Sequence, residues 1–288
     1  MRYYAAAVYL FLYAPIALIV LFSFNAGRHA ASFECCATDW YGRTFNNTFL
    51  IEALLNSLMI AGVTAVLATL MGTMAALALQ RVRGPLRLLF DALTYIAIII
   101  PGIVIGIATL VALVTVFQVV NPLIAELWPG SGDSAPSLRL GFGSVIAAHT
   151  LFTMALVIVI VRARIQGMDR SLIEASADLY ATPWATFRQV TLPQIFPAVM
   201  SGFLLSFTFS FDDFIIAFFV AGSKTTLPIY VFSSIRRGIT PETNVIATTV
   251  LAVSLTLLIT AQLLLRTRNP KSSQKAAPAR SEQKDMNE

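Results

Sequence analysis

The chain has 288 residues, of which 57% are hydrophobic and 12% are charged, whereas an average soluble domain carries about 25% charged residues. Such a chain lacks the polar surface of a soluble enzyme, and it has too much apolar surface to stay disordered over most of its length. Two cysteines and two histidines exclude a disulfide framework and a Cys-rich metal site, and they leave little room for a histidine metal centre. The formal net charge is +5, and its distribution is more informative than its size.

Long unbroken apolar runs predict an all-α membrane protein. A helix needs roughly 20 mostly apolar residues to cross a bilayer, whereas barrel strands would alternate apolar and polar residues. Six segments meet the helical criterion, namely 5–24, 53–79, 88–120, 140–161, 195–220 and 244–265. The third contains Pro101 and Gly102, which a membrane helix tolerates when neighbours satisfy the freed backbone groups. The first is long enough to span and more spans follow, which favours a helix over a cleaved signal peptide.

Lysine and arginine set the expected orientation. With six spans and the N-terminus in the cytoplasm, most of the 20 basic residues fall on the cytoplasmic side, as the positive-inside rule requires. The expected domain is therefore a membrane region over 1–268 with both termini cytoplasmic, followed by a polar, disordered cytoplasmic tail over 269–288. Cys35 and Cys36 lie in the first outer loop, and we expect unpaired thiols because a ring closed between neighbours is strained.

The segment between spans four and five, over 163–193, is ordered beyond the needs of a connector. Ser171 and Glu174 have the spacing of a capping box, which predicts a helix start. Thr182 followed by Pro183 predicts a second start. The segment is therefore expected to form a helix, a tight turn and a short helix ending at Leu192 and Pro193. The alternative is an amphipathic helix lying on lipid headgroups.

This segment resembles the EAA loop of ATP-binding-cassette importer permeases, and we call it the EAA-like loop (163–193). The family pattern is E-A-A, three residues, G, nine residues and I-x-L-P. The matching positions are Glu174, Ala175, Ser176, Tyr180, Val190, Leu192 and Pro193. Ser176 replaces Ala, Val190 replaces Ile and Tyr180 replaces Gly. The third change matters most, because a glycine ends a helix in the left-handed conformation without the cost of about 1–2 kcal/mol that other residues carry.

Further motifs resemble the polyamine permeases, in particular the second permease subunit of spermidine/putrescine importers. They are Leu12–Pro15, Phe22–Asn25, Trp40–Tyr41, Ser206–Asp213, Thr226–Pro228 and Pro241–Asn244. The resemblance implies a bacterial inner-membrane subunit that works with two copies of an ABC ATPase, a second homologous permease and a periplasmic solute-binding protein, without nucleic acid. It also implies that the chain is not an enzyme and needs no cofactor, because ATP is bound by the ATPase. The nearest approach to a phosphate loop, around Lys224, lacks the Gly-Lys pair.

The resemblance assigns ATPase coupling to the EAA-like loop. Glu174 can pair with a basic residue in a groove of the ATPase, and it can also cap its own helix. Arg170 and Arg188 are candidates for polar contacts at the same edge, or they are ordinary positive-inside charges.

An acidic pair in the fifth span indicates the substrate path. Asp212 and Asp213 are costly at membrane depth, where ionisable residues usually face a bundle interior or a watery cavity. Gly202, Ser206, Ser210 and Asp213 share one helix face, and Phe209 and Phe214 offer cation–π surfaces. These features suit a small organic cation. Alternatively, the pair holds a structural hydrogen bond. Trp40 and Tyr41 either line the outer mouth or belong to an interfacial aromatic belt.

Gly102 limits the substrate prediction. Many polyamine permeases of this kind carry an acidic residue there, so this chain offers less negative charge to a di- or triamine. The substrate is therefore a polyamine such as spermidine or putrescine, or a singly charged solute such as an aminophosphonate or amino-acid derivative. His149 either packs with a satisfied hydrogen bond or lines the path. An ion-coupled carrier would show internal repeats, and a membrane enzyme would need more clustered polar groups.

Overall fold

The structure is a computed structural model that describes residues 2–27, 32–129, 135–169, 171–238 and 241–267. It divides into two compact units, one formed by 1–44 with 237–288 and the other by 45–236. Every regular element of the described residues is a helix, which confirms the all-α prediction. The expected tail at 269–288 lies outside the described residues.

The first unit pairs the two ends of the chain. Helix α1 (Arg2–Phe22) and helix α12 (Pro241–Thr267) pack against each other, and the short helix α2 (Asp39–Phe45) follows the loop after α1. Cys35 and Cys36 in this loop are joined by a disulfide. The expectation of unpaired thiols is therefore wrong, because the local backbone brings the two neighbouring sulfur atoms together.

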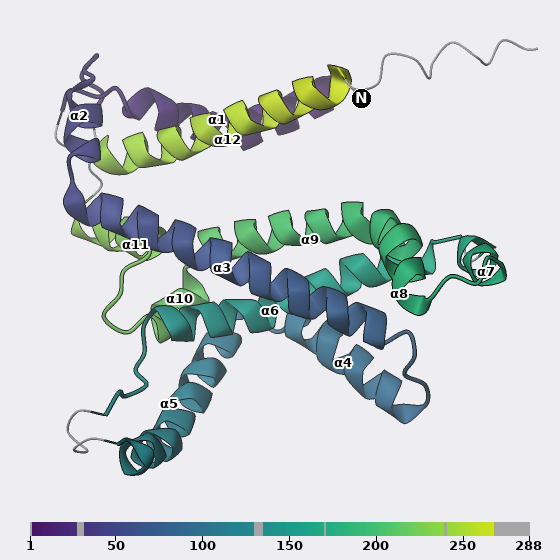
Figure 1. Cartoon of the computed structure of the whole chain (residues 1–288). Coiled ribbons are helices and arrows are strands. Elements are labelled where there is room, and N and C mark those ends of the chain that lie inside the picture. Colours follow the sequence, from purple (N-terminus) through teal and green to yellow (C-terminus); the bar gives the residue numbers. More distant parts are fainter. Residues whose placement is uncertain (1, 28–31, 130–134, 170, 239–240, 268–288) are drawn as a thin grey trace, which may run out of the picture. The chain divides into compact units, whose positions relative to one another are not determined.

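The second unit is built on three long helices that pack against one another (Figure 1). They are α3 (Thr48–Ala78), α6 (Phe142–Gln166) and α9 (Leu192–Asp212). Glycines allow this close approach, since a Cβ at Gly72 would lie 2.8 Å from Val157 Cβ and one at Gly202 would lie 3.3 Å from Val157 Cγ1. Small residues at such crossings are typical of helix packing in membranes, where van der Waals contact drives association.

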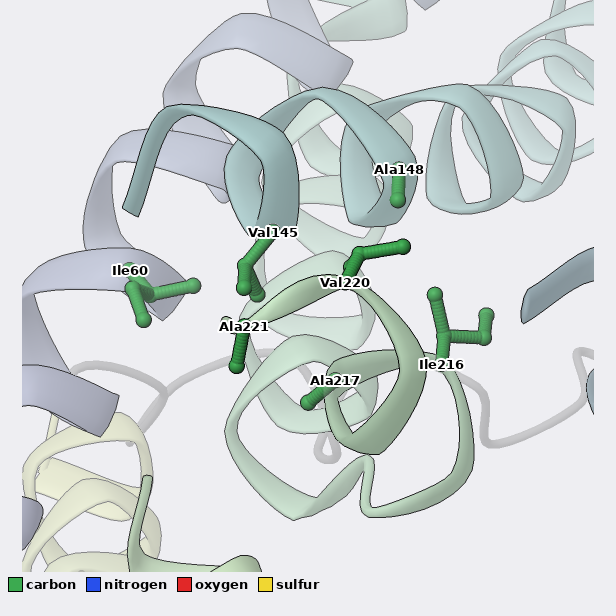
Figure 2. Close-up of a cluster of buried hydrophobic side chains, with 7 residues drawn as sticks. All are labelled: Ile60, Val145, Ala148, Ile216, Ala217, Val220 and Ala221. Atoms are coloured by element: carbon green, nitrogen blue, oxygen red, sulfur yellow. The ribbon is translucent and has the colours of Figure 1, made fainter. Parts of the chain in front are cut away.

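A cluster of buried side chains holds the short helix α10 (Ile215–Val220) against the long helices of the second unit (Figure 2). Its members come from α3, α6, α10 and the residue after α10, and they are Ile60, Val145, Ala148, Ile216, Ala217, Val220 and Ala221. Helix α10 also packs on α5 (Gly102–Leu127). A Cβ at Gly106 of α5 would lie 2.8 Å from Phe219 Cδ2 and 3.4 Å from Ile216 Cα, so this position requires glycine for the contact.

The expected third span is two helices, which corrects the prediction of one span over 88–120. Helix α4 (Pro85–Ile99) ends before Pro101, and α5 begins at Gly102. Ile100 is extended, with φ −62° and ψ 133°, because the ring of a proline disfavours the helical conformation of the preceding residue. The reason is steric: neighbouring helices could satisfy the freed backbone groups, but they do not remove the clash between the proline ring and the preceding residue.

The expected fifth span over 195–220 is also interrupted. Helix α9 ends at Asp212, Asp213 is extended with φ −72° and ψ 121°, and α10 starts at Ile215. At its other end α9 begins earlier than expected, because the chain stays helical through α8 (Pro183–Thr186) and a π-helical turn, η2 (Phe187–Thr191). A wider turn accommodates Pro193, whose ring would clash with a carbonyl in a regular helix. The predicted end at Leu192 and Pro193 is therefore wrong.

Five helical segments of the described residues are long and apolar enough to cross a membrane, namely Arg2–Phe22, Thr48–Ala78, Gly102–Leu127, Phe142–Gln166 and Pro183–Asp212. The expected sixth span, 244–265, falls within α12, a 27-residue helix. The count of six spans therefore stays a prediction.

Candidate functional site: the EAA-like loop and the acidic helix break

The EAA-like loop (163–193) folds as two helical segments joined by a tight turn. Helix α7 (Ser171–Asp178) starts at the predicted place, but Ser171 is its first residue rather than its N-cap, and no capping-box hydrogen bond joins Ser171 and Glu174 among the described residues. Its first turn is capped by Asp169, whose Oδ1 accepts a hydrogen bond from the Ser171 amide at 2.9 Å. This hydrogen bond lowers the pKa of the Asp169 carboxyl below its ordinary value, so the cap is charged throughout the neutral range. Arg170 lies outside the described residues.

The second start is confirmed in detail. Thr182 is the N-cap of α8 and accepts a hydrogen bond from the Ala185 amide at 3.3 Å, with Pro183 in the first turn. Trp184 and Phe187 lie on one face, with ring centroids 5.6 Å apart. Both helical starts therefore follow from the residues that cap them.

Tyr180 adopts the left-handed conformation that the family pattern gives to glycine. Its φ is +55°. The Ala181 amide donates to the Ser176 carbonyl at 3.0 Å, and the Tyr180 amide donates to the Ala177 carbonyl at 2.9 Å. These are the two hydrogen bonds of a Schellman motif, with Tyr180 at the position that usually holds glycine. The turn therefore has the geometry of a Schellman motif, although Tyr180 carries the steric cost of a side chain in the left-handed conformation.

Ser176, the second departure from the family pattern, ties the two helices together. Its hydroxyl donates to the Ile173 carbonyl at 2.7 Å and lies 3.0 Å from Thr186 Oγ1 of α8. An alanine at this position would lack the link to Thr186.

Glu174 and Ala175 are exposed on α7, and Leu192 packs on the buried cluster of Ala76, Val157, Val161 and Ile195. Pro193 is exposed in the first turn of α9, so the loop presents α7 outward while Leu192 anchors its end.

The tip of the loop exposes large apolar side chains. Tyr180 is 96% exposed, Leu179 81% and Trp184 68%. Leu179 and Tyr180 lie in the turn between α7 and α8 and Trp184 lies in α8, whereas Glu174 lies in the first turn of α7. An exposed apolar patch of this kind is typical of a protein contact surface. Arg188 is also exposed, and the structure gives it no contact with Glu174 among the described residues.

The acidic pair occupies the break between α9 and α10, and its two members differ. Asp213 Oδ2 accepts hydrogen bonds from the Ile216 and Ala217 amides at 2.9 and 3.0 Å, so it caps α10. The same oxygen lies 3.3 Å from His149 Nε2 of α6. Asp212 is exposed, and no hydrogen bond or ion pair joins its carboxylate to another described residue. Asp213 thus makes structural hydrogen bonds, but these are local caps of the helix that follows it. The hydrogen bond between packed helices that the sequence suggested for the pair stays a prediction.

The small-residue stripe of α9 faces the interior of the second unit. Gly202, Ser206 and Ser210 are buried, and Ser210 Oγ lies 2.8 Å from His149 Nδ1. The prediction of a shared face holds for these three residues, but Asp213 follows the end of the helix. Phe209 is 44% exposed. Lining of a substrate path by these residues stays a prediction.

The two helix breaks of the second unit lie close together. A Cβ at Gly102, the first residue of α5, would be 4.0 Å from Ile215 Cβ, the first residue of α10. Phe214, between Asp213 and α10, packs against Phe232 with tilted rings and a centroid distance of 4.4 Å. Gly102 is therefore near the acidic break, at a distance that leaves room for a side chain.

Trp40 and Tyr41 belong to the first unit, and their place relative to the acidic break is not described. Within that unit the Arg43 guanidinium lies over the Trp40 ring, 5.2 Å from its centroid. The Tyr41 hydroxyl lies 2.9 Å from Ser23 Oγ. Both aromatic residues thus have local structural contacts, and their role at an outer mouth stays a prediction.

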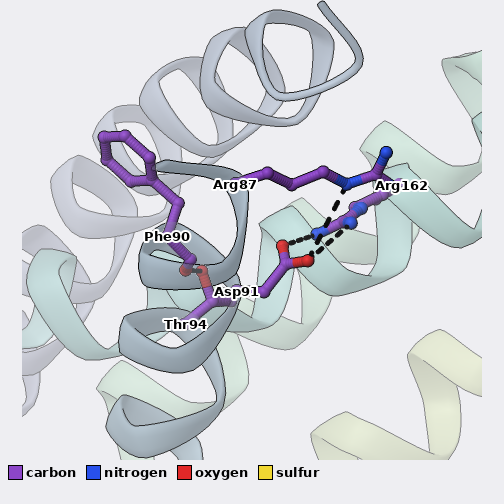
Figure 3. A network of polar contacts seen from close by, with 5 residues as sticks. All are labelled: Arg87, Phe90, Asp91, Thr94 and Arg162. Atoms are coloured by element: carbon purple, nitrogen blue, oxygen red, sulfur yellow. Dashed lines mark hydrogen bonds and ion pairs between the residues drawn. The ribbon is translucent and has the colours of Figure 1, made fainter. Parts of the chain in front are cut away.

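Sequence reasoning missed an ion pair between α4 and α6 (Figure 3). Arg162 donates to both carboxylate oxygens of Asp91, with Nη2 3.1 Å from Oδ2, and Arg87 Nε lies 3.9 Å from Asp91 Oδ2. Arg87 and Asp91 are four residues apart, which was the available signal for a helical ion pair. The partnership with Arg162 depends on tertiary packing that the sequence does not reveal.

Comparison with known proteins agrees with this architecture. The family described as binding-protein-dependent transport system inner membrane component matches residues 68–273. The chain is 37% identical over 263 residues to the spermidine/putrescine transport system permease protein PotC of Haemophilus influenzae, covering 91% of this chain and 95% of the relative. It is 37% identical over 245 residues to the putrescine transport system permease protein PotI of Escherichia coli (strain K12), covering 84% and 82%.

A solved structure shows the same fold at low sequence identity. The bacterial ABC transporter involved in the import of the acidic polysaccharide alginate superimposes with a TM-score of 0.66 and 17% identity, over 93% of this chain and 94% of that one. The resemblance drawn from the EAA-like loop and the further motifs is confirmed. The chain belongs to the family of inner-membrane components of binding-protein-dependent transport systems, and it is a permease subunit of an ATP-binding-cassette importer rather than an enzyme.

Proposed function

We propose that this permease imports a small organic cation of the polyamine class, such as spermidine or putrescine. The observation that carries the proposal is the exposed Asp212 carboxylate at the α9–α10 break. An unpaired carboxylate at membrane depth is costly unless it faces a watery cavity or a partner of opposite charge. The relatives PotC and PotI are permeases for spermidine/putrescine and for putrescine, which belong to the same class of solute.

The two acids have different tasks in this proposal. Asp213 is committed to the α10 amides, while Asp212 is free to meet an ammonium group. Phe209, three residues before Asp212 and 44% exposed, offers a ring for cation–π attraction. Gly102 adds no charge, so a second ammonium group of the solute would find its carboxylate on the partner permease.

We further propose that the EAA-like loop couples transport to ATP hydrolysis on a partner ATPase. The exposed Leu179, Tyr180 and Trp184 supply the apolar contact, and Glu174 supplies a charge for a basic residue. The assembly comprises two ATPase copies, a second homologous permease and a periplasmic solute-binding protein. Both termini are cytoplasmic, which places this loop on the ATPase side. ATP binds the ATPase, and the permease holds no cofactor.

The test is uptake by the assembled importer in proteoliposomes with its binding protein. Labelled putrescine and spermidine should enter in an ATP-dependent, saturable manner. Asp212→Asn keeps size and removes charge, and it should lower uptake roughly tenfold to a hundredfold through the loss of one charge-assisted contact. ATP-dependent uptake of a labelled aminophosphonate or amino-acid derivative, without polyamine uptake, would assign the alternative solute class. Normal polyamine uptake in Asp212→Asn would remove Asp212 from the path.

A further inference from the structure

His149 is buried in α6 at the level of the acidic break. The residue is 2% exposed, and each ring nitrogen faces a polar group of a different segment. Nδ1 lies 2.8 Å from Ser210 Oγ in the last turn of α9. Nε2 lies 3.3 Å from Asp213 Oδ2 at the break. The imidazole is therefore hydrogen-bonded to the end of one helix, and it lies within ion-pair distance of the cap of the next without the alignment of a hydrogen bond.

Helix α6 also holds the opposite end of α10. Ser144 Oγ donates to the Val220 carbonyl at 2.6 Å, while Asp213 beside His149 accepts from the first amides of α10. Between these two contacts, Val145 and Ala148 of α6 pack on Ile216 and Val220 (Figure 2). The six-residue α10 is thus positioned by α6 at both termini, and an isolated helix of this length has little stability of its own.

We infer that His149 is a positioning residue that fixes the geometry of the α9–α10 break. Nε2 is buried and has no aligned hydrogen-bond partner among the described residues, and the atom that faces it at 3.3 Å is a carboxylate oxygen, which can only accept. We therefore assign the imidazole proton to Nε2, where it attracts the Asp213 carboxylate electrostatically. Nδ1 then accepts from the Ser210 hydroxyl. This arrangement orients the Asp213 carboxylate toward the α10 amides. It also fixes the backbone of the preceding residue, Asp212. The effect of His149 on transport, which would act through Asp212, rests on the proposed function.

The competing explanation is that His149 only fills space between α6 and α9. Two substitutions separate the explanations, because they place an amide group at different depths along the side chain. His149→Asn provides an amide near the position of Nδ1, within reach of Ser210. His149→Gln extends an amide to the position of Nε2, within reach of Asp213. A space-filling role predicts that the smaller asparagine and the larger glutamine differ only through volume.

The primary measurement is hydrogen exchange of the peptide that covers Ile216 and Ala217, in the purified complex with its ATPase and partner permease. His149→Asn should accelerate exchange of these two amides roughly three- to thirtyfold, the range expected for a weakened helix cap. Asp213→Ala, which removes the cap itself, sets the upper limit. His149→Gln should exchange within about twofold of the wild type. Thr150→Val, a near-isosteric change at the next buried residue of α6, is the matched control.

Two outcomes would overturn the positioning role. One is exchange in His149→Asn equal to that of Thr150→Val. The other is equal acceleration in His149→Asn and His149→Gln across peptides of α3, α6 and α9, which is the signature of lost packing.

Uptake measured on the same preparations tests the link to transport. His149→Asn should raise the putrescine concentration for half-maximal uptake several-fold, and His149→Gln should restore it. Accelerated exchange with unchanged uptake would retain the positioning role and remove the break from the solute path, so the two failures are distinguishable.

Discussion

Tyr180→Gly should stabilise the turn of the EAA-like loop. Tyr180 has a φ of +55°, and the left-handed conformation costs a residue with a Cβ about 1–2 kcal/mol. Because its side chain is 96% exposed, removing the ring sacrifices almost no burial within this chain. Glycine has greater freedom in the unfolded loop, which offsets about 0.5–1 kcal/mol. The net stabilisation of the turn is about 0.5–1 kcal/mol. Hydrogen exchange of the amides of residues 180 and 181, which are hydrogen-bonded in the turn, should therefore be roughly two- to fivefold slower.

Tyr180→Ala is the matched control, because alanine removes the ring but keeps the left-handed strain. Exchange should slow in Tyr180→Gly and not in Tyr180→Ala, measured on peptides over α7 and α8 in the purified complex. If glycine and alanine give the same exchange rates, the strain argument is refuted. Solute-stimulated ATPase activity adds a separate readout. An equal loss of activity in both variants would show that the tyrosine ring contacts the ATPase.

The remaining predictions concern coupling, packing and topology. Glu174→Arg should abolish uptake while the complex still assembles, and Asp178→Arg on the same helix should be milder; near-normal uptake and stimulated ATPase activity in Glu174→Arg would contradict the coupling role. Asp91→Asn should destabilise the second unit by about 1–3 kcal/mol, since it leaves Arg162 partly buried without its carboxylate. A thermal melt of the purified permease complex should show a lower melting temperature. An unchanged melting temperature would mean that the Asp91–Arg162 ion pair does not contribute to stability. With Cys35 and Cys36 changed to serine, Ser137→Cys should react with an impermeant thiol reagent in intact cells and Arg83→Cys should not; the reverse pattern would place the termini outside.

The sequence predicts the long helices of the second unit well but not their interruptions. Apolar length identifies a membrane segment, yet it carries no information on whether the helix is continuous. The signal at Pro101 was available, because a proline disfavours a helical residue before it. The break at Asp213 had a weaker signal, since a polar residue in an apolar segment fits either a helix face or a helix end. The π-helical turn before Pro193 arises from a similar conflict between proline and helix.

The EAA-like loop was more predictable than the acidic break for a physical reason. Caps and turns depend on residues that are close in the sequence. The short segment from Tyr180 to Pro183 therefore contains the signals that predict them, namely the family glycine position at Tyr180, Thr182 and Pro183. The partners of His149 are 61 and 64 residues away along the chain, and the partner of Asp91 is 71 residues away. Such pairs depend on which helix faces pack together, which apolar periodicity alone does not determine. The disulfide of Cys35 and Cys36 was local, and the strain argument gave the wrong result.

The two adjacent acids differ in how far the chain itself compensates their charges. A buried carboxylate needs donors to offset the loss of water, and an interrupted helix supplies them as the free amides at the start of its second part. Asp213 accepts hydrogen bonds from two of these amides and lies 3.3 Å from His149 Nε2, so its charge is partly compensated within the chain. Asp212 lies in the last turn of α9, where free carbonyl groups and the negative end of the helix offer no compensation. Under the proposed function a cation is the expected partner of Asp212, because its binding would supply the compensation that the chain itself does not.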